Sequence, residues 1–187
     1  MPPRRYLFDP PERFVAGTVG QPGDRTFFLQ ARDGARIVSI VLEKVQVAVL
    51  ADRLRDLLAE LERRGVASAS TDPATGLTDD TGPLDEPINE AFRAGTLTLG
   101  WDGEDERILV EAHAQSEDGA EADAEPDDEE MDDLDLLRVR ITADAARSFV
   151  ARAARIVASG RPPCPLCGAP LDPQGHICPR RNGHLVN

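Results

Sequence analysis

The sequence predicts an α+β protein in which a β-β-β-α unit occurs twice and is followed by a short cysteine-rich module. Residues 13–65 and 91–160 share the order of three strand patterns and one amphipathic helix pattern. The pentapeptide Phe14-Val-Ala-Gly-Thr18 recurs as Phe92-Arg-Ala-Gly-Thr96 with a single change. All three cysteines of the 187-residue chain lie between positions 164 and 178.

The first unit begins with three strand patterns joined by two tight turns. The strands are expected at residues 13–20, 25–32 and 35–42, and Pro22-Gly23 and Asp33-Gly34 mark the turns. From about Glu43 the spacing of apolar residues changes from two to between three and four, which predicts a helix of roughly twenty residues. Gly65 is the expected C-terminal cap of this helix.

A linker or long surface loop is expected at residues 66–90, where Ser, Thr, Asp, Pro and Gly are frequent and no apolar period is visible. The strands of the second unit follow at residues 92–101, 107–114 and 136–141.

The last helix of the second unit is expected to start at Thr142 as N-cap and to end before Gly160. Its apolar residues share one face, and its arginines are expected mostly elsewhere: Arg147, Arg152 and Arg155.

The two units predict an antiparallel sheet, or a small open barrel, with both helices on one face. Residues 1–160 would form this core. The repeated element order favours an internal duplication over a chance similarity of five residues.

The net charge of -13 comes mainly from residues 116–135, which contain twelve carboxylates and no Lys or Arg. The remainder of the chain is close to neutral. This composition predicts a disordered, solvated loop inside a hairpin of the second unit. A tether for cations or for a basic partner is the functional alternative, although the ligand spacing of a calcium loop is missing.

A cytoplasmic location without membrane association is expected. No apolar run approaches the ~20 residues that cross a bilayer, and the N-terminal residues contain no apolar core of signal-peptide length. An odd number of clustered cysteines suits a reducing compartment and a metal better than a disulfide framework.

Cys164-Pro-Leu-Cys167 has the spacing of a zinc-ribbon-like knuckle, in which two thiolates reach one tetrahedral ion. Cys178 supplies a third thiolate. His176, two residues before Cys178, and His184, six residues after it, are alternative fourth ligands. A set of three cysteines and one histidine favours Zn²⁺. Since four protein ligands leave no coordination position open, residues 161–187 are expected to form a module around a structural ion.

Known catalytic motifs are missing from the sequence: there is no GxSxG, phosphate-binding P-loop, GxGxxG or HExxH. An enzyme is therefore not predicted. His113 is interpreted as a half-exposed strand residue, Glu43-Lys44 as a charged helix start, and Trp101 as a core or edge anchor. The module contains three arginines, Arg161, Arg180 and Arg181. No aromatic residues are interleaved with them, so they are weak support for nucleic-acid binding.

Four segments resemble an uncharacterised actinobacterial family of unknown function (DUF3090-like) whose members end in a cysteine module: Phe14–Gly20, Leu42–Gln46, Gly160–Cys167 and Leu171–Cys178. The resemblance covers nearly the whole chain and implies a cytosolic protein with no assigned activity. It also implies His176 as the zinc ligand, because the position matching His184 is often Tyr. Members tend to be encoded beside a histidine-phosphatase-like and a kinase-like protein, which implies a shared pathway.

Three functions follow as expectations. The first is a non-enzymatic binding or adaptor protein with a protein partner. The second is an enzyme or enzyme subunit that acts on a phosphorylated metabolite in a cleft between the two units, which predicts a pocket lined by Lys44 and other basic groups. The third is nucleic-acid binding through the module, against which the acidic composition argues. The oligomeric state is not predicted.

Overall fold

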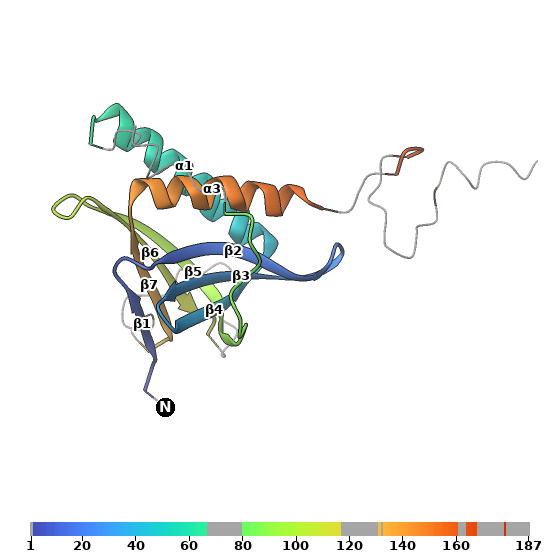
Figure 1. Ribbon diagram of the computed structural model, residues 1–187, viewed down its shortest axis with the longest axis horizontal. Helices are drawn as coiled ribbons and strands as arrows, with labels where there is room; N and C mark the ends of the chain where they lie inside the picture. Colours follow the sequence, from blue (N-terminus) through green and yellow to red (C-terminus); the bar gives the residue numbers. More distant parts are fainter. Residues whose placement is uncertain are drawn as a thin grey trace, which may run out of the picture.

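The computed structural model describes residues 2–66, 80–116, 131, 133–160, 164–167 and 178. Within these residues a seven-stranded sheet has the order β1-β7-β6-β5-β4-β3-β2, and helices α1 and α3 lie next to each other (Figure 1). The elements are β1 (Arg5–Phe8), β2 (Arg13–Gln21), β3 (Asp24–Asp33), β4 (Arg36–Leu42), α1 (Lys44–Arg63), β5 (Glu90–Asp102), β6 (Arg107–Ala114), β7 (Leu136–Ile141) and α3 (Ala143–Ala158). The predicted α+β class is confirmed, and so is the order of strands and helices.

The sheet contains two antiparallel groups, β2-β3-β4 and β5-β6-β7, which are joined by a parallel pairing of β4 with β5. The expectation of a purely antiparallel sheet is therefore wrong. Strands β4 and β5 are separated in the chain by α1, and a crossover of this length lets the second strand run in the same direction as the first. Strand β1, which was not predicted, pairs in parallel with β7. Its four residues are too few to show a period.

Both predicted hairpin turns of the first unit are confirmed. Gln21 pairs with Asp24 across one turn, and Asp33 pairs with Arg36 across the other. Gly23 and Gly34 have φ values of 103° and 56°, in the region that only glycine adopts readily.

Polar caps fix both helix starts. Glu43 and Gln46 form a capping box at the start of α1, and the Gln46 amide also donates to the backbone carbonyls of β5 at 3.0–3.1 Å. Thr142 caps α3 as predicted, because its hydroxyl accepts a hydrogen bond from the Ala145 N–H at 3.2 Å. Gly65 ends α1 with a φ of 69°, and its N–H donates to the Glu62 carbonyl.

The main hydrophobic core is shared by both units. It joins alternate residues of the strands with the apolar sides of α1 and α3. The rings of Phe14 on β2 and Phe149 on α3 stack with centroids 5.0 Å apart, so the helix of the second unit packs on the first strand of the first unit. Trp101 packs against this core, as expected.

A second, smaller core lies on the opposite side of strands β2, β3 and β4. It consists of Val15, Phe28, Val41 and Leu84. Leu84 is only 7 % exposed although it lies in the segment expected to be a linker. Leu84 therefore anchors this part of the segment to the sheet, and the last residue of the segment, Glu90, belongs to β5. No apolar period is visible in this segment because its contribution to the second core comes mainly from one residue, Leu84.

The interpretation of His113 as half-exposed is wrong. Its neighbour Ala112 faces the main core, so His113 points to the other side of β6, where it is 7 % exposed. A ring nitrogen lies 3.3 Å from the Met131 carbonyl oxygen, which covers it. Met131 lies within the acidic segment, residues 116–135. Burial of this kind comes from a distant residue that strand periodicity does not reveal.

Candidate metal centre

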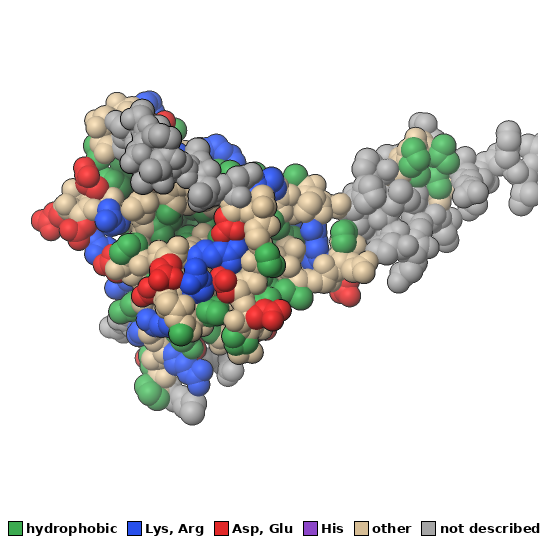
Figure 2. All heavy atoms as spheres, viewed as in Figure 1, with side chains coloured by type: hydrophobic (Ala, Val, Ile, Leu, Met, Phe, Trp, Pro, Cys, Tyr) green, Lys and Arg blue, Asp and Glu red, His purple; other side chains and the backbone are tan. Residues whose placement is uncertain are grey.

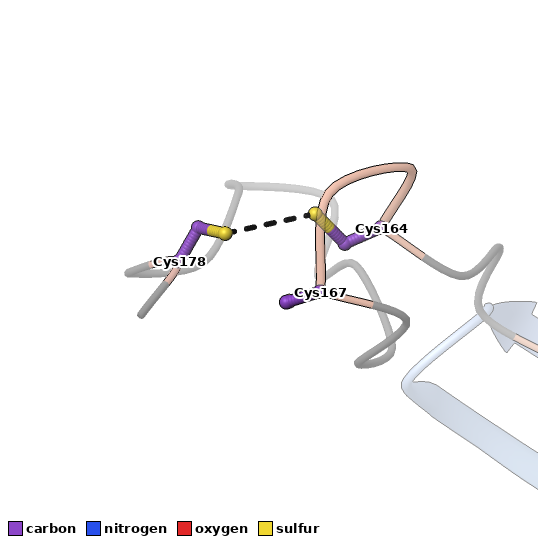
Figure 3. A group of neighbouring side chains, drawn as sticks. All are labelled: Cys164, Cys167 and Cys178. Carbon is purple, nitrogen blue, oxygen red and sulfur yellow. Dashed lines mark hydrogen bonds between the residues drawn. The ribbon is translucent and has the colours of Figure 1, made fainter. Parts of the chain in front are cut away.

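Three cysteine sulfurs form a compact cluster, with all ligand atoms within 4.8 Å of one another. Cys164 and Cys167 lie on one short turn, and Cys178 faces them from a separate segment (Figure 3). The Sγ atoms of Cys164 and Cys178 are 4.0 Å apart. The three cysteines form no disulfide bonds with one another. The structure thus brings together the three cysteines that spacing singled out, at the end of the chain beyond α3 (Figure 1).

The turn presents its backbone amides to one of these sulfurs. The Leu166 N–H donates to the Cys164 Sγ at 3.4 Å. Hydrogen bonds from the backbone N–H groups of Cys167 and Leu166 lower the pKa of the Cys164 thiol. This favours the thiolate, which is the form that binds metals.

The geometry fits a thiolate-bound metal ion. A tetrahedral ion with metal–sulfur distances of about 2.3 Å places its sulfurs about 3.8 Å apart, close to the separation of Cys164 and Cys178. Both of these residues are 6 % exposed, so their thiolates would be partly shielded from water and from competing ligands.

Several predicted features lie outside the described residues. These are both candidate histidine ligands, His176 and His184, and most of the acidic segment, residues 117–130 and 132.

The sequence did not predict a buried arginine at the contact of α3 with β2. Arg152, expected on the polar side of α3, is 6 % exposed. Its guanidinium donates to the Ala16 carbonyl at 2.6 Å, to the Asp80 carboxylate at 2.8 Å and to the Gly82 carbonyl at 2.7 Å. Burial lowers the pKa of Arg152. Because these partners belong to β2 and to residues 80–82, Arg152 holds residues 80–82 against β2, which is an edge strand of the sheet.

Asp80 is also bound by Arg13 at the start of β2. The Arg13 Nε donates to the Asp80 carboxylate at 2.6 Å, and this hydrogen bond lowers the pKa of Asp80. The sequence gives little sign of this cluster. Arg152 lies next to buried positions of α3, but helical periodicity does not distinguish such an arginine from one on the surface.

A cavity of about 200 Å³ opens where β3, the start of α1 and the end of α3 meet. Its lining residues are Gly23, Arg25, Phe27, Lys44 and Gly160. Arg25 and Lys44 are the basic residues of this lining.

No helix within the described part of the chain combines the length and the apolar character that crossing a membrane requires.

Residues 6–178 match the model of a family described as "Protein of unknown function (DUF3090)". This range extends from β1 through both helices to the last cysteine. No curated protein and no solved structure matches the chain.

Proposed function

Because the chain belongs to the DUF3090 family, whose description assigns no activity, we propose from its own residues that it is a non-enzymatic binding or adaptor protein with a structural zinc ion. The cluster of three cysteine sulfurs carries this proposal. Zinc is the ion that small thiolate-rich sites with an additional histidine usually hold. With four protein ligands, the ion has no open position for water or substrate, so it stabilises the module and takes no part in chemistry.

The proposed ligands are Cys164, Cys167, His176 and Cys178. His176 is two residues before Cys178, so on an extended segment both side chains would point the same way and bind one ion together. The family resemblance favours the same histidine. His184 is the competing ligand.

Cobalt substitution tests the ligand set. Purified protein is expected to contain one zinc per chain, and the Cys167→Ser protein is expected to lose it. In the cobalt-loaded protein, His176→Ala should disturb the tetrahedral absorption, whereas His184→Ala should leave it unchanged. If His184→Ala alone disturbs the spectrum, the choice of His176 is wrong. If the cobalt protein shows no tetrahedral spectrum and no preparation contains zinc, the metal proposal fails.

The adaptor role is supported by the surface of the folded part. Figure 2 shows Lys and Arg side chains intermixed with Asp and Glu side chains on the viewed face, and Leu166 at the tip of the cysteine turn is 52 % exposed. We also propose a cytoplasmic location, because an odd number of clustered cysteines suits a reducing compartment better than a disulfide framework. Affinity capture from native cytosol is expected to retain a partner on the wild-type protein and to lose it with Cys164→Ser. The absence of any partner, together with turnover in a metabolite screen, would refute this role.

An enzyme or enzyme subunit that acts on a phosphorylated metabolite is the second candidate. The cavity beside Lys44 favours it, because its lining comes from the first unit and from Gly160 at the end of the second. Turnover of a phosphorylated compound that is lost in the Lys44→Gln protein would support it. Nucleic-acid binding through the module has no comparable observation, since Arg161, Arg180 and Arg181 lie outside the described residues.

We also propose that residues 13–65 and 91–160 arose by duplication and place their helices on one face of the shared sheet. Phe14 and Phe92 begin the repeated pentapeptides, and both lie in the main core together with residues of α1 and α3. At Gly17 and Gly95 an added Cβ would come within 3.0 Å of a neighbouring carbon. An experimental structure in which the two units do not superimpose strand for strand would contradict the duplication.

A further inference from the structure

Two cations line the 200 Å³ cavity, and neither has a carboxylate partner among the residues that the structure describes. Lys44 is the first residue of α1, and Arg25 lies near the start of β3. Most other arginines in the described part of the fold form ion pairs with carboxylates: Arg13, Arg32, Arg55, Arg63, Arg64, Arg93, Arg138, Arg140, Arg147 and Arg152. Two cations beside one cavity that have no carboxylate partner within the described ranges are therefore a distinct feature of this surface.

Another cavity, beside β2, does not share this property. It has a volume of about 140 Å³ and includes Arg13 and Arg152 in its lining. The guanidinium groups of both arginines are already bound to Asp80 and to backbone carbonyls. A ligand in this cavity would have to compete with those contacts, so the cavity beside Lys44 is the better anion site.

Donor groups remain available at the cavity. Arg25 donates one hydrogen bond, from Nη1 to the Ser159 hydroxyl at 3.1 Å, out of the five N–H groups of a guanidinium. Its guanidinium carbon lies 5.5 Å from the centroid of the Phe27 ring, which orients it. A Cβ added at Gly160 would lie 3.8 Å from the Lys44 Nζ, which is ordinary van der Waals contact. The absence of side chains at Gly23 and Gly160 leaves the space between these groups open.

Size and charge together define the ligand. Pockets for drug-sized molecules usually enclose about 300–1,000 Å³, so the smaller volume here suits a compact ligand. Two cations without a carboxylate match a dianionic group, and arginine and lysine are the residues that usually bind phosphate. We infer that Arg25 and Lys44 bind the phosphate group of a small phosphomonoester, with the rest of the molecule in the open space beside Gly23 and Gly160.

A different role for these cations has to be separated from this one. They lie at the C-terminal end of α3, whose last carbonyls carry partial negative charge. If Arg25 and Lys44 only neutralise this helix end, their removal lowers stability and no anion binds. The inference rests on the second candidate function, but it concerns binding alone. Binding without turnover would support the site while excluding that enzyme role.

Isothermal titration calorimetry with inorganic phosphate and with glucose 6-phosphate, at low ionic strength, tests the site. Saturable binding is expected for both probes and should be tighter for the sugar phosphate. Lys44→Gln and Arg25→Gln should each weaken it at least about fivefold, the size of one exposed charge-assisted hydrogen bond. Gly160→Val keeps both cations but fills the cavity, so it should also abolish or weaken binding.

Arg53→Gln is the matched control, because it removes one positive charge from an exposed position of the same helix outside the cavity. Its affinity should stay within about twofold of the wild-type value. Circular dichroism of each variant checks that it is folded. No saturable binding of either probe, or an equal loss in Arg53→Gln and Lys44→Gln, would overturn the inference. Lower melting temperatures in the cavity variants without a phosphate effect on the wild type would assign the cations to the helix end.

Discussion

Replacement of Gly17 by alanine should destabilise the protein although the change adds one methyl group. A Cβ built at Gly17 lies 2.4 Å from the Leu84 Cδ2 and 2.5 Å from its Cγ. Non-bonded carbon atoms normally stay about 3.5–4.0 Å apart, so Leu84 must move by about 1 Å or change its rotamer. Overpacking of this kind costs about 1–3 kcal/mol.

A double-mutant cycle shows whether this cost arises at Leu84. Leu84→Ala alone removes a side chain that is 7 % exposed and should cost about 2–4 kcal/mol. In the double variant, the methyl group added by Gly17→Ala enters the space that Leu84 leaves. The double variant should therefore be about 1–3 kcal/mol more stable than the sum of the single changes indicates.

Urea unfolding followed by far-ultraviolet circular dichroism measures all three variants. Gly100→Ala is the matched control on β5, where an added Cβ would meet the Leu109 Cβ at an ordinary 3.6 Å. Its stability should stay within about 1 kcal/mol of the wild-type value. Wild-type stability of Gly17→Ala, or strict additivity with Leu84→Ala, would show that the segment around Leu84 does not pack on β2 in solution.

The remaining predictions concern the arginine cluster beside β2. Arg152→Met should lower the free energy of unfolding by about 3–5 kcal/mol, because it leaves buried carbonyls without donors and Asp80 with one arginine fewer. Arg55→Met, at an exposed ion pair with Asp52, should change it by no more than about 0.5 kcal/mol in the same urea titration. The pKa of Asp80 is lowered in the folded protein from its ordinary value of 3.8, so its stabilising effect is complete above that pH and is lost as the pH falls through the folded value. Asp80→Asn should therefore be less stable than the wild type at pH 7 and should lose less stability than the wild type below about pH 4. Thermal unfolding at a series of pH values measures this difference. Equal acid sensitivity in both proteins would exclude Asp80 as a contributor to the pH dependence of stability.

Local patterns predicted the elements well because their causes are local. The turn at Gly34 needs a residue that adopts a positive φ, and the start of α3 needs a side chain like Thr142 that accepts an amide hydrogen bond. Both requirements are visible in a few neighbouring residues. The cysteine cluster was predictable for a similar reason, because the spacing of Cys164 and Cys167 places both on one short turn.

Contacts between distant segments were not predictable in this way. The pairing of β1 with β7 joins residues 5 and 136, and the burial of Arg152 depends on Asp80 and on the edge of β2. Each depends on partners that are distant in the sequence, so the amphipathic pattern of α3 placed Arg152 on the wrong side. The cavity beside Lys44 is a further case, since its two cations come from β3 and from the start of α1.

The cysteine module and the cavity are close in the chain, and metal removal tests whether they are also linked in energy. Gly160 lines the cavity and Cys164 follows four residues later, so the first cysteine is at most about 14 Å from the cavity wall along an extended chain. The main core contains none of the cysteines, so EDTA should increase hydrogen exchange in residues 161–187 and leave the strands and helices protected.

Since the bound ion would also hold the chain that leaves Gly160, EDTA should weaken phosphate binding by a few-fold, which calorimetry with and without the chelator measures. Cys167→Ser protein without EDTA should behave in the same way, which separates loss of the ion from other effects of the chelator. Loss of protection throughout the sheet would show that core and module fold as one unit, and unchanged phosphate affinity would show that the two sites are independent.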